Sequence, residues 1–340
     1  MKYNFKNLVF EGGGVKSIAF GGALDVLNQK KLLQNITRVA GTSAGAINAT
    51  LLALGYSSKE VSDIVADTDF STFEDSSNFF SDVLRVIRKF GWNKGDAFTD
   101  FMREQIRKKT NSADFTFEQL NQAVKDNGGG FRHLYVASTN LSAQKVQVFS
   151  HEDTPDVKIA DAVRMSMSIP LYFKAVKWHG DIMVDGGVSY NYPIDLFDNV
   201  KYLDSEKNGK HETYSNVEDH VFNYETLGFR LDSKEVIEYA RNNWEIPPKN
   251  ITNIKKYSLG LIDFMMEMAN RVHLHQNDWG RTVFIDTLGV KTTDFKGVKE
   301  RIDDLINSGK KAVSDYFNWR DKDAMWSAIP NFPEEKNDVT

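Results

Sequence analysis

A serine at the centre of a Gly-x-Ser-x-Gly motif is the residue best suited to chemistry in this chain. Ser43 lies between Gly41 and Gly45, after a short apolar run and before a stretch that favours a helix. This spacing is typical of a strained turn from a strand into a helix, which exposes the serine Oγ as a nucleophile. The supporting glycines let the chains cross closely at such a turn. We therefore interpret Ser43 as a candidate nucleophile.

A serine hydroxyl needs a base to take its proton during attack, and Asp185 is the strongest candidate for that base. Histidine is the usual base, but none of the seven histidines follows a predicted strand in a catalytic context. Asp185 ends an apolar strand, and Gly186 and Gly187 permit a tight turn that presents its carboxylate. Burial would raise the basicity of that carboxylate. The alternative is a solvated aspartate in a turn, which suits Asp181 better.

A glycine triplet after the first predicted strand could supply the electrophilic part of the site. Successive backbone N–H groups in a glycine-rich loop form a concave binding site for an anion, such as the oxyanion of a tetrahedral intermediate. The triplet is Gly12, Gly13 and Gly14. Lys16 follows as a candidate contact for an anionic headgroup, with an ordinary surface lysine as the alternative. The spacing fits neither a dinucleotide-binding loop nor a Walker A loop.

Alternating strands and helices predict an α/β fold. The predicted strands cover residues 7–10, 36–40, 134–141, 145–149, 172–178, 182–184 and 282–286. The predicted helices cover residues 18–27, 44–54, 98–108, 117–125 and 159–167. This order favours a three-layer α/β/α architecture with a largely parallel central sheet. Ligands in such folds bind at the carboxyl ends of the strands, where we expect the glycine triplet, Ser43 and Asp185 to meet.

The length of 340 residues allows one large domain or a catalytic domain with an appendage. We predict a catalytic core at residues 1–200, with a helical insertion at about residues 56–130. Residues 201–329 should form a mostly helical C-terminal extension with one strand packed on the core, and residues 330–340 a disordered tail.

Composition and charge exclude several classes of function. The formal net charge of −5 argues against nucleic acid as a partner. The absence of cysteine excludes disulfides, thiolate metal sites and a cysteine nucleophile, and we predict neither a cofactor nor a metal. The N-terminus lacks the apolar core of a signal peptide, and no apolar run is long enough to span a membrane. We expect a cytoplasmic protein that acts peripherally at membranes.

Two apolar segments are candidates for contact with lipid. Residues 79–92 place apolar side chains at helical spacing with basic residues elsewhere on the wheel, which suits a helix lying on an anionic membrane. An ordinary amphipathic helix packed on the core is the alternative. Residues 257–272 are apolar most of the way round a helix, so we predict core or a pocket wall there, with a lid as the lesser alternative.

Taken together, these motifs resemble the patatin-like phospholipase family. The match comprises Gly12–Lys16, Gly41–Gly45 and Asp185–Gly187, in this order. Residues 166–170 (Ser-Met-Ser-Ile-Pro) also resemble the serine and proline block of the family. The resemblance covers residues 7–200 and continues weakly through residues 281–286, a stretch typical of bacterial members.

The resemblance implies a patatin-like fold and hydrolysis of lipid acyl esters without calcium, by a Ser–Asp dyad that lacks histidine. By position, Ser43 is the nucleophile, Asp185 the base, Gly12–Gly14 the oxyanion loop and Lys16 the basic position of the family. The implied substrate is a phospholipid or another acyl lipid. An acyltransferase is an alternative, although its malonyl-transferring relatives carry histidine beside the serine. Another is a lipid-binding regulatory module that needs a protein or small-molecule activator.

Overall fold

The computed structural model of the protein describes residues 3–68, 91–126, 130–204, 209–211, 219–234, 251–252, 276–292, 294 and 297–322, with single positions between 257 and 268. Its centre is an eight-stranded sheet. Seven strands follow one another across it: β12 (Thr282–Asp286), β11 (Thr226–Asp232), β1 (Asn7–Phe10), β2 (Arg38–Thr42), β4 (His133–Asn140), β8 (Asp181–Asp185) and β7 (Val176–Trp178). The strand β5 (Lys145–Phe149) also pairs with β4.

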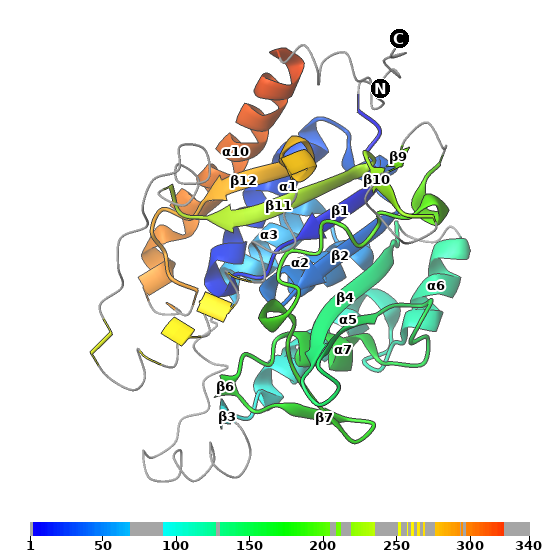
Figure 1. Ribbon diagram of the computed structural model, residues 1–340, viewed down its shortest axis with the longest axis vertical. Coiled ribbons are helices and arrows are strands. Elements are labelled where there is room, and N and C mark those ends of the chain that lie inside the picture. Colours follow the sequence, from blue (N-terminus) through cyan, green and yellow to red (C-terminus); the bar gives the residue numbers. More distant parts are fainter. Residues whose placement is uncertain are drawn as a thin grey trace.

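The strands from β12 to β4 run parallel, whereas β5, β8 and β7 are antiparallel to their neighbours. Helices flank this sheet, and Figure 1 shows α1 and α10 on the far side of the parallel strands. The prediction of an α/β fold with a largely parallel sheet is confirmed. The helices are α1 (Ala19–Gln29), α2 (Ala44–Ala53), α3 (Ser58–Asp67), α5 (Asp96–Thr110), α6 (Phe117–Lys125), α7 (Ile159–Ser166) and α10 (Ile302–Lys322).

Both faces of the central strands are buried. On β1, Leu8 and Phe10 belong to the large core cluster that the helices share, whereas Val9 belongs to a second cluster. That second cluster contains Tyr192 and Phe197, which lie in the segment that follows β8. Side chains alternate between the faces of a strand, so burial on both faces requires a continuous apolar run. This explains why three consecutive residues of the first strand, Leu8, Val9 and Phe10, are apolar.

The C-terminal extension contributes more of the sheet than the sequence predicts. In addition to β12 it supplies β11, which lies between β12 and β1, so the prediction of a single strand is wrong. Polar and small residues interrupt the apolar run of β11. Arg230 pairs with Asp232 at 2.7 Å, and a Cβ on Gly228 would lie 1.9 Å from the Tyr192 hydroxyl oxygen. The close packing of Gly228 against Tyr192 is a long-range contact, and such contacts compensate for residues that argue against a strand locally.

Of the other predicted elements, some are confirmed and some are wrong. The strands predicted at residues 172–178 and 182–184 correspond to β7 and β8, which pair as a hairpin, and α3, α5 and α6 confirm helices in the insertion. The insertion is not wholly helical, because β3 (Gly91–Asn93) pairs with β6 (Leu171–Phe173). Two further strands of the predicted helical extension, β9 (Gly209–His211) and β10 (Val221–Asn223), pair with each other outside the central sheet.

The two apolar segments have different outcomes. Residues 79–90 and the tail at residues 330–340 lie outside the described residues, and Trp92 lies in β3. In the second segment the described apolar side chains are exposed, so the prediction that they form core is wrong; these are Tyr257, Leu261, Phe264, Met265 and Met268. Among the helices that the structure describes, none is both long and apolar enough to cross a membrane.

Candidate active site

The structure brings Ser43 and Asp185 into direct contact. The Ser43 Oγ–H donates a hydrogen bond to Asp185 Oδ2 over 2.7 Å. Both side chains are buried, with exposed fractions of 1% and 0%. The contact joins residues that are 142 positions apart in the chain.

Asp185 reaches this position by a route that the sequence did not predict. The strands β1 and β2 are parallel, so the glycine triplet and Ser43 follow their carboxyl ends at one edge of the sheet. The strand β8 is antiparallel to β4, so the expectation that three strands end at the same edge is wrong for Asp185. Instead, Asp185 pairs with Ser138 of β4, one residue beyond the Ala137 that pairs with Thr42. Asp185 therefore reaches Ser43 from an antiparallel strand, and β4 lies between that strand and β2.

The turn at Ser43 is strained and tightly packed. Ser43 has φ 53° and ψ −127°, a conformation that a residue with a side chain rarely adopts. A Cβ on Gly41 would lie 2.4 Å from the Gly45 carbonyl oxygen, and a Cβ on Gly45 would lie 2.4 Å from that of Phe10. Helix α2 begins immediately after the serine, so its positive dipole end lies beside Oγ. Only glycine fits at either flanking position.

Residues of the serine and proline block support this turn, a role that the sequence analysis did not assign to them. The Ser43 N–H donates to Ser166 Oγ over 2.8 Å, and the Ser166 hydroxyl donates to the Ala137 carbonyl over 2.6 Å. The Ser168 carbonyl accepts the Asp185 N–H over 2.9 Å. The block therefore connects the backbones of Ser43 and Asp185, and its likeness to the family was the available signal.

The environment of Asp185 favours uptake of a proton. Burial raises the pKa of its carboxyl from an ordinary value of 3.8 to about 7, although hydrogen bonds from Ser43 and Gly187 oppose this rise. The Gly187 N–H donates to Oδ1 over 2.7 Å. Within the described part of the chain, no lysine, arginine or histidine pairs with this carboxylate. A carboxylate in a dry site without a cation is a stronger base than one in water.

The glycine loop lies against the nucleophile, since a Cβ on Gly12 would be 3.1 Å from the Ser43 Cβ. The Gly12 N–H already donates to the Asn191 carbonyl over 3.1 Å. The N–H groups of Gly13 and Gly14 donate to no other residue that the structure describes. Lys16 lies in the short 3-10 helix Gly14–Ile18 that follows, with its Cε 3.6 Å from where a Cβ on Gly13 would lie.

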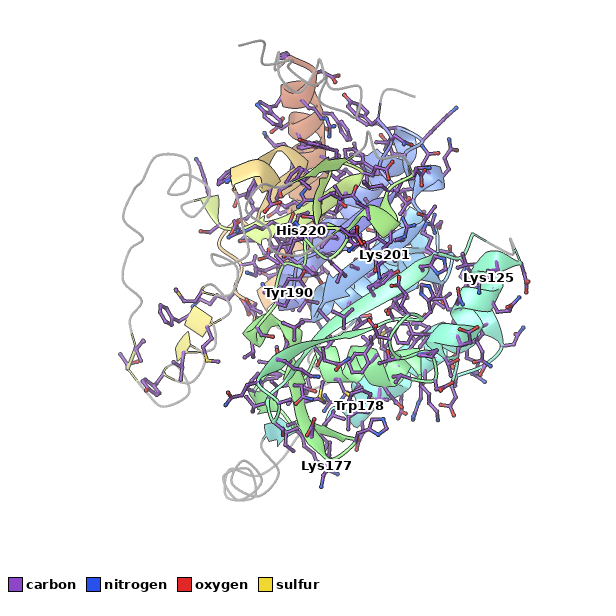
Figure 2. The ribbon with its side chains drawn as sticks, turned by 45° about the vertical axis from the view of Figure 1, so that its right-hand side comes forward. Lys125, Lys177, Trp178, Tyr190, Lys201 and His220 are labelled. Carbon is purple, nitrogen blue, oxygen red and sulfur yellow. The ribbon has the colours of Figure 1, made fainter. Side chains whose placement is uncertain are left out.

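Asp181 and the described histidines do not form part of this arrangement. Asp181 accepts a hydrogen bond from Asn140 Nδ2 over 2.7 Å and lies beside the hairpin turn. His133 and His151 stack on each other at 4.3 Å and start or follow strands at the opposite edge of the sheet. Figure 2 shows Trp178 of the hairpin well away from Tyr190, which follows Asp185 closely in the chain. In the described ranges, no three His, Asp or Glu side chains gather as metal ligands would.

Comparison with known proteins agrees with these motifs. The family model described as patatin-like phospholipase matches residues 8–198. The uncharacterised protein YqhO of Bacillus subtilis is 30% identical over 315 residues, which are 89% of this chain and 94% of that protein. The chain belongs to the patatin-like phospholipase family. This membership supports hydrolysis of lipid acyl esters at the level of the family.

Other members and a solved structure extend this comparison. An uncharacterised protein of Acanthamoeba polyphaga mimivirus is 36% identical over 194 residues, 57% of this chain and 61% of that protein, so the match spans less than two thirds of that relative. A probable lipid hydrolase of Invertebrate iridescent virus 6 is 28% identical over 211 residues, 61% of this chain and 67% of that protein. The crystal structure of VipD from Legionella pneumophila shares the fold, with a TM-score of 0.56, 18% identity, and coverage of 93% of this chain and 67% of that one.

Proposed function

We propose that the protein is a lipid acyl hydrolase that cleaves fatty acyl esters with Ser43 and Asp185 and needs no calcium. The observation that carries the proposal is the buried 2.7 Å hydrogen bond from Ser43 Oγ to Asp185 Oδ2 at a strained strand-to-helix turn. A nucleophile within hydrogen-bond reach of its base is the arrangement that covalent catalysis by serine requires. Membership of the patatin-like family, and a relative named as a probable lipid hydrolase, support an acyl lipid as substrate.

In the proposed first step, Asp185 takes the proton of Ser43 as Oγ forms a bond to the acyl carbonyl carbon. The carbonyl electron pair moves to the oxygen, which becomes the oxyanion of a tetrahedral intermediate. When this intermediate collapses, the bond to the lipid alcohol breaks and Asp185 returns the proton to the leaving oxygen. Water then attacks the acyl-enzyme, with Asp185 as base again, and the fatty acid leaves as Ser43 recovers its proton.

The pKa of Asp185 suits both halves of this cycle. A general base works best when its pKa lies near the operating pH, because it must accept a proton in one step and release it in the next. Burial raises the pKa of Asp185 to about 7, against hydrogen bonds from Ser43 and Gly187 that lower it. The same aspartate at its ordinary pKa would be a poor base for a serine hydroxyl.

We assign the oxyanion site to the N–H groups of Gly13 and Gly14. The Gly12 N–H is engaged by the Asn191 carbonyl, so its proposed part is to hold the loop beside Ser43. Donors that are fixed before the reaction stabilise the developing charge without reorganisation. Lys16, at the end of this loop, is the proposed contact for an anionic headgroup. The lipid itself is the proposed partner, met at a membrane surface.

The test is release of free fatty acid from mixed phospholipid vesicles with excess chelator, comparing wild type with Ser43→Ala. We expect release by the wild type alone. Ser150→Ala is a matched control, because Ser150 is also fully buried and its Oγ accepts the N–H groups of Glu152 and Asp153 in a distant turn. This control should keep its activity. Equal release by wild type and Ser43→Ala would rule out the proposed nucleophile.

A further inference from the structure

A buried acid that the proposed reaction does not use lies immediately before the glycine loop. Glu11 has an exposed fraction of 1%. Its Oε2 accepts a hydrogen bond from the Leu231 N–H of β11, and its Oε1 accepts one from Asn191 Nδ2 over 3.2 Å. Glu11 is thus bonded to two segments that are remote in sequence, on either side of the loop.

Asn191 bonds to both the N–H and the carbonyl of Gly12, the first glycine of the loop. Its Nδ2 donates to the Gly12 carbonyl over 3.2 Å, and its own carbonyl accepts the Gly12 N–H over 3.1 Å. A Cβ on Gly12 would lie 2.4 Å from Asn191 Oδ1 and 3.1 Å from the Ser43 Cβ. Gly12 is therefore packed between the asparagine and the nucleophile. A shift of Asn191 would move the loop relative to Ser43.

The other segment that Glu11 contacts packs on the next glycine. A Cβ on Gly13 would lie 2.5 Å from Leu231 Cδ1, and Leu231 is the residue whose N–H Glu11 accepts. Glu11 therefore connects the strand that packs against Gly13 with the asparagine that holds Gly12. The two hydrogen bonds of the Glu11 carboxyl group therefore hold Leu231 and Asn191, which pack against Gly13 and Gly12, at a set distance from each other.

We propose that Glu11 and Asn191 are positioning residues that hold the N–H groups of Gly13 and Gly14 at the oxyanion. This inference rests on the proposed hydrolase function. Neither side chain touches the reacting atoms; both act through the backbone of the loop. Oxyanion donors stabilise the transition state only when they are fixed near the position that the charged oxygen will occupy. Loosening the loop should therefore lower kcat and leave substrate binding unchanged.

The substitution Glu11→Gln separates this role from a general role in stability. Burial raises the pKa of Glu11 to about 8; Arg230 and Lys16 lower it and Asp232 raises it. Between the unfolded pKa near 4.5 and about pH 8, the folded protein keeps a proton that the unfolded chain loses, so stability falls as pH rises. Glutamine has the same shape and is neutral in both states, so it avoids the cost of protonating this buried acid at neutral pH. Glu11→Gln should therefore fold at least as stably as the wild type at neutral pH.

The same substitution should disturb the loop. The new glutamine side chain can keep its oxygen for the Leu231 N–H, but its NH₂ group then faces the NH₂ group of Asn191, and two donors cannot bond to each other. If the Asn191 amide turns over to accept from that glutamine, its oxygen faces the Gly12 carbonyl oxygen. Either way, one of the two hydrogen bonds that Asn191 Nδ2 now donates is lost.

The experiment compares wild type and Glu11→Gln in three measurements: kcat and KM for a soluble acyl ester, inhibition by an alkyl trifluoromethyl ketone, and thermal unfolding. The ketone forms a reversible adduct with serine that carries the oxyanion. We expect kcat to fall about tenfold to 100-fold, less than loss of an oxyanion donor itself would cause. We also expect KM to stay unchanged, the inhibition constant to rise by the same factor, and Tm not to fall. Active sites are counted with a fluorophosphonate.

A matched control lies at the other end of the same strand. Asn7 is fully buried on β1 and donates to Thr226 of β11 over 3.1 Å. Asn7→Ala should lower Tm and leave kcat per active site and the inhibition constant unchanged. If Glu11 were merely structural, both variants would behave in this way.

The possible outcomes separate the two proposals. Wild-type kcat and inhibition constant in Glu11→Gln would overturn the positioning role while leaving the hydrolase function intact. No hydrolysis by the wild type would instead count against the proposed function. If Glu11→Gln fails to fold, Asn191→Ala tests the proposal instead. We expect this variant to lose kcat and affinity for the ketone in parallel. Normal values of both would overturn the proposal.

Discussion

Two buried aspartates, Asp185 and Asp198, have opposite surroundings. Both belong to the stretch from β8 to β9, and their exposed fractions are 0% and 6%. Asp198 receives two hydrogen bonds from the Arg281 guanidinium, over 2.5 and 2.6 Å. Among the residues that the structure describes, Asp185 receives only a serine hydroxyl and a backbone N–H. Burial is similar, but only one of the two charges is matched by a cation.

The Arg281 cluster is built for stability. The guanidinium also donates to Asp278 over 2.7 Å and lies 3.9 Å from the centre of the Phe222 ring. Burial alone would lower the pKa of Arg281, but the carboxylates of Asp198 and Asp278 raise it above its ordinary value. Burial raises the pKa of Asp198, and the charge and hydrogen bonds of Arg281 oppose that rise. The arginine therefore stays charged and opposes the effect of burial on Asp198.

The difference shows how one fold can give two buried aspartates opposite electrostatic surroundings. A buried carboxylate that is paired with a cation stays ionised, whereas one that lacks a cation is poised to take a proton. Where the sheet needs a cross-link between β12 and the segment after β8, arginine supplies the compensating charge. Beside Ser43, where we propose that a base acts, the described residues supply no compensating cation.

The largest effect should come from removing the uncompensated carboxylate. Asp185→Asn keeps the shape but cannot accept the Ser43 proton, so we expect kcat to fall by about 10⁴-fold. The variant should fold normally, because asparagine has no charge to bury. Fatty acid release and a thermal unfolding curve check both statements. Near-normal release would return the search for the base to the histidines.

Removing the compensating cation should instead act on stability. Arg281→Met leaves the carboxylates of Asp198 and Asp278 buried without the charge of the guanidinium, and breaking such a pair costs about 3–5 kcal/mol. Urea denaturation should show this loss in the free energy of unfolding. The activity per folded molecule should remain close to that of the wild type, since Arg281 is not in contact with Ser43 or Asp185. A large loss of kcat in fully folded protein would contradict the prediction that Arg281 acts on stability alone.

The pH dependence of the wild type should report the raised pKa of Asp185. Because the reaction needs the ionised form, kcat/KM should fall about tenfold per pH unit below about pH 7. The contribution of Asp185 to stability changes in the opposite direction. Between about pH 4 and 7 the folded state holds a proton that the unfolded chain loses, so this contribution falls as pH rises. Comparing the free energy of unfolding of the wild type with that of Asp185→Asn across this pH range isolates the contribution of Asp185 to stability. A flat rate profile down to about pH 5 would contradict the assignment.

The smallest effect is expected at the other aspartate of β8. Asp181→Asn removes a charge four residues from Asp185, but its carboxylate bonds to Asn140 at the hairpin and not to the site. We expect kcat/KM within about twofold of the wild type, because surface substitutions of this kind are usually near neutral. Fatty acid release under the conditions used for Asp185→Asn provides the measurement. A loss comparable to that variant would mean that the net charge of the strand matters more than the dyad contact.

The sequence by itself determined the parts of the site that depend on local geometry. The turn at Ser43 needs glycine at positions 41 and 45, and the short apolar strands before it and before Gly12 need burial on both faces. Such constraints act over a few residues, so spacing and composition are enough to recognise them. The α/β fold class follows from the same local patterns.

Only the tertiary structure decided which distant residues meet. The strand β11 was not recognised because Gly228 argues against a strand locally, and its close packing against Tyr192 exists only in the folded chain. The approach of Asp185 to Ser43 depends on an antiparallel pairing of β8 with β4. Glu11 reaches Leu231 across 220 positions of sequence, and nothing local distinguishes it from a surface acid. Long-range contacts fix the environment of a side chain, and the environment of a buried carboxylate sets whether it is inert, positioning or reactive.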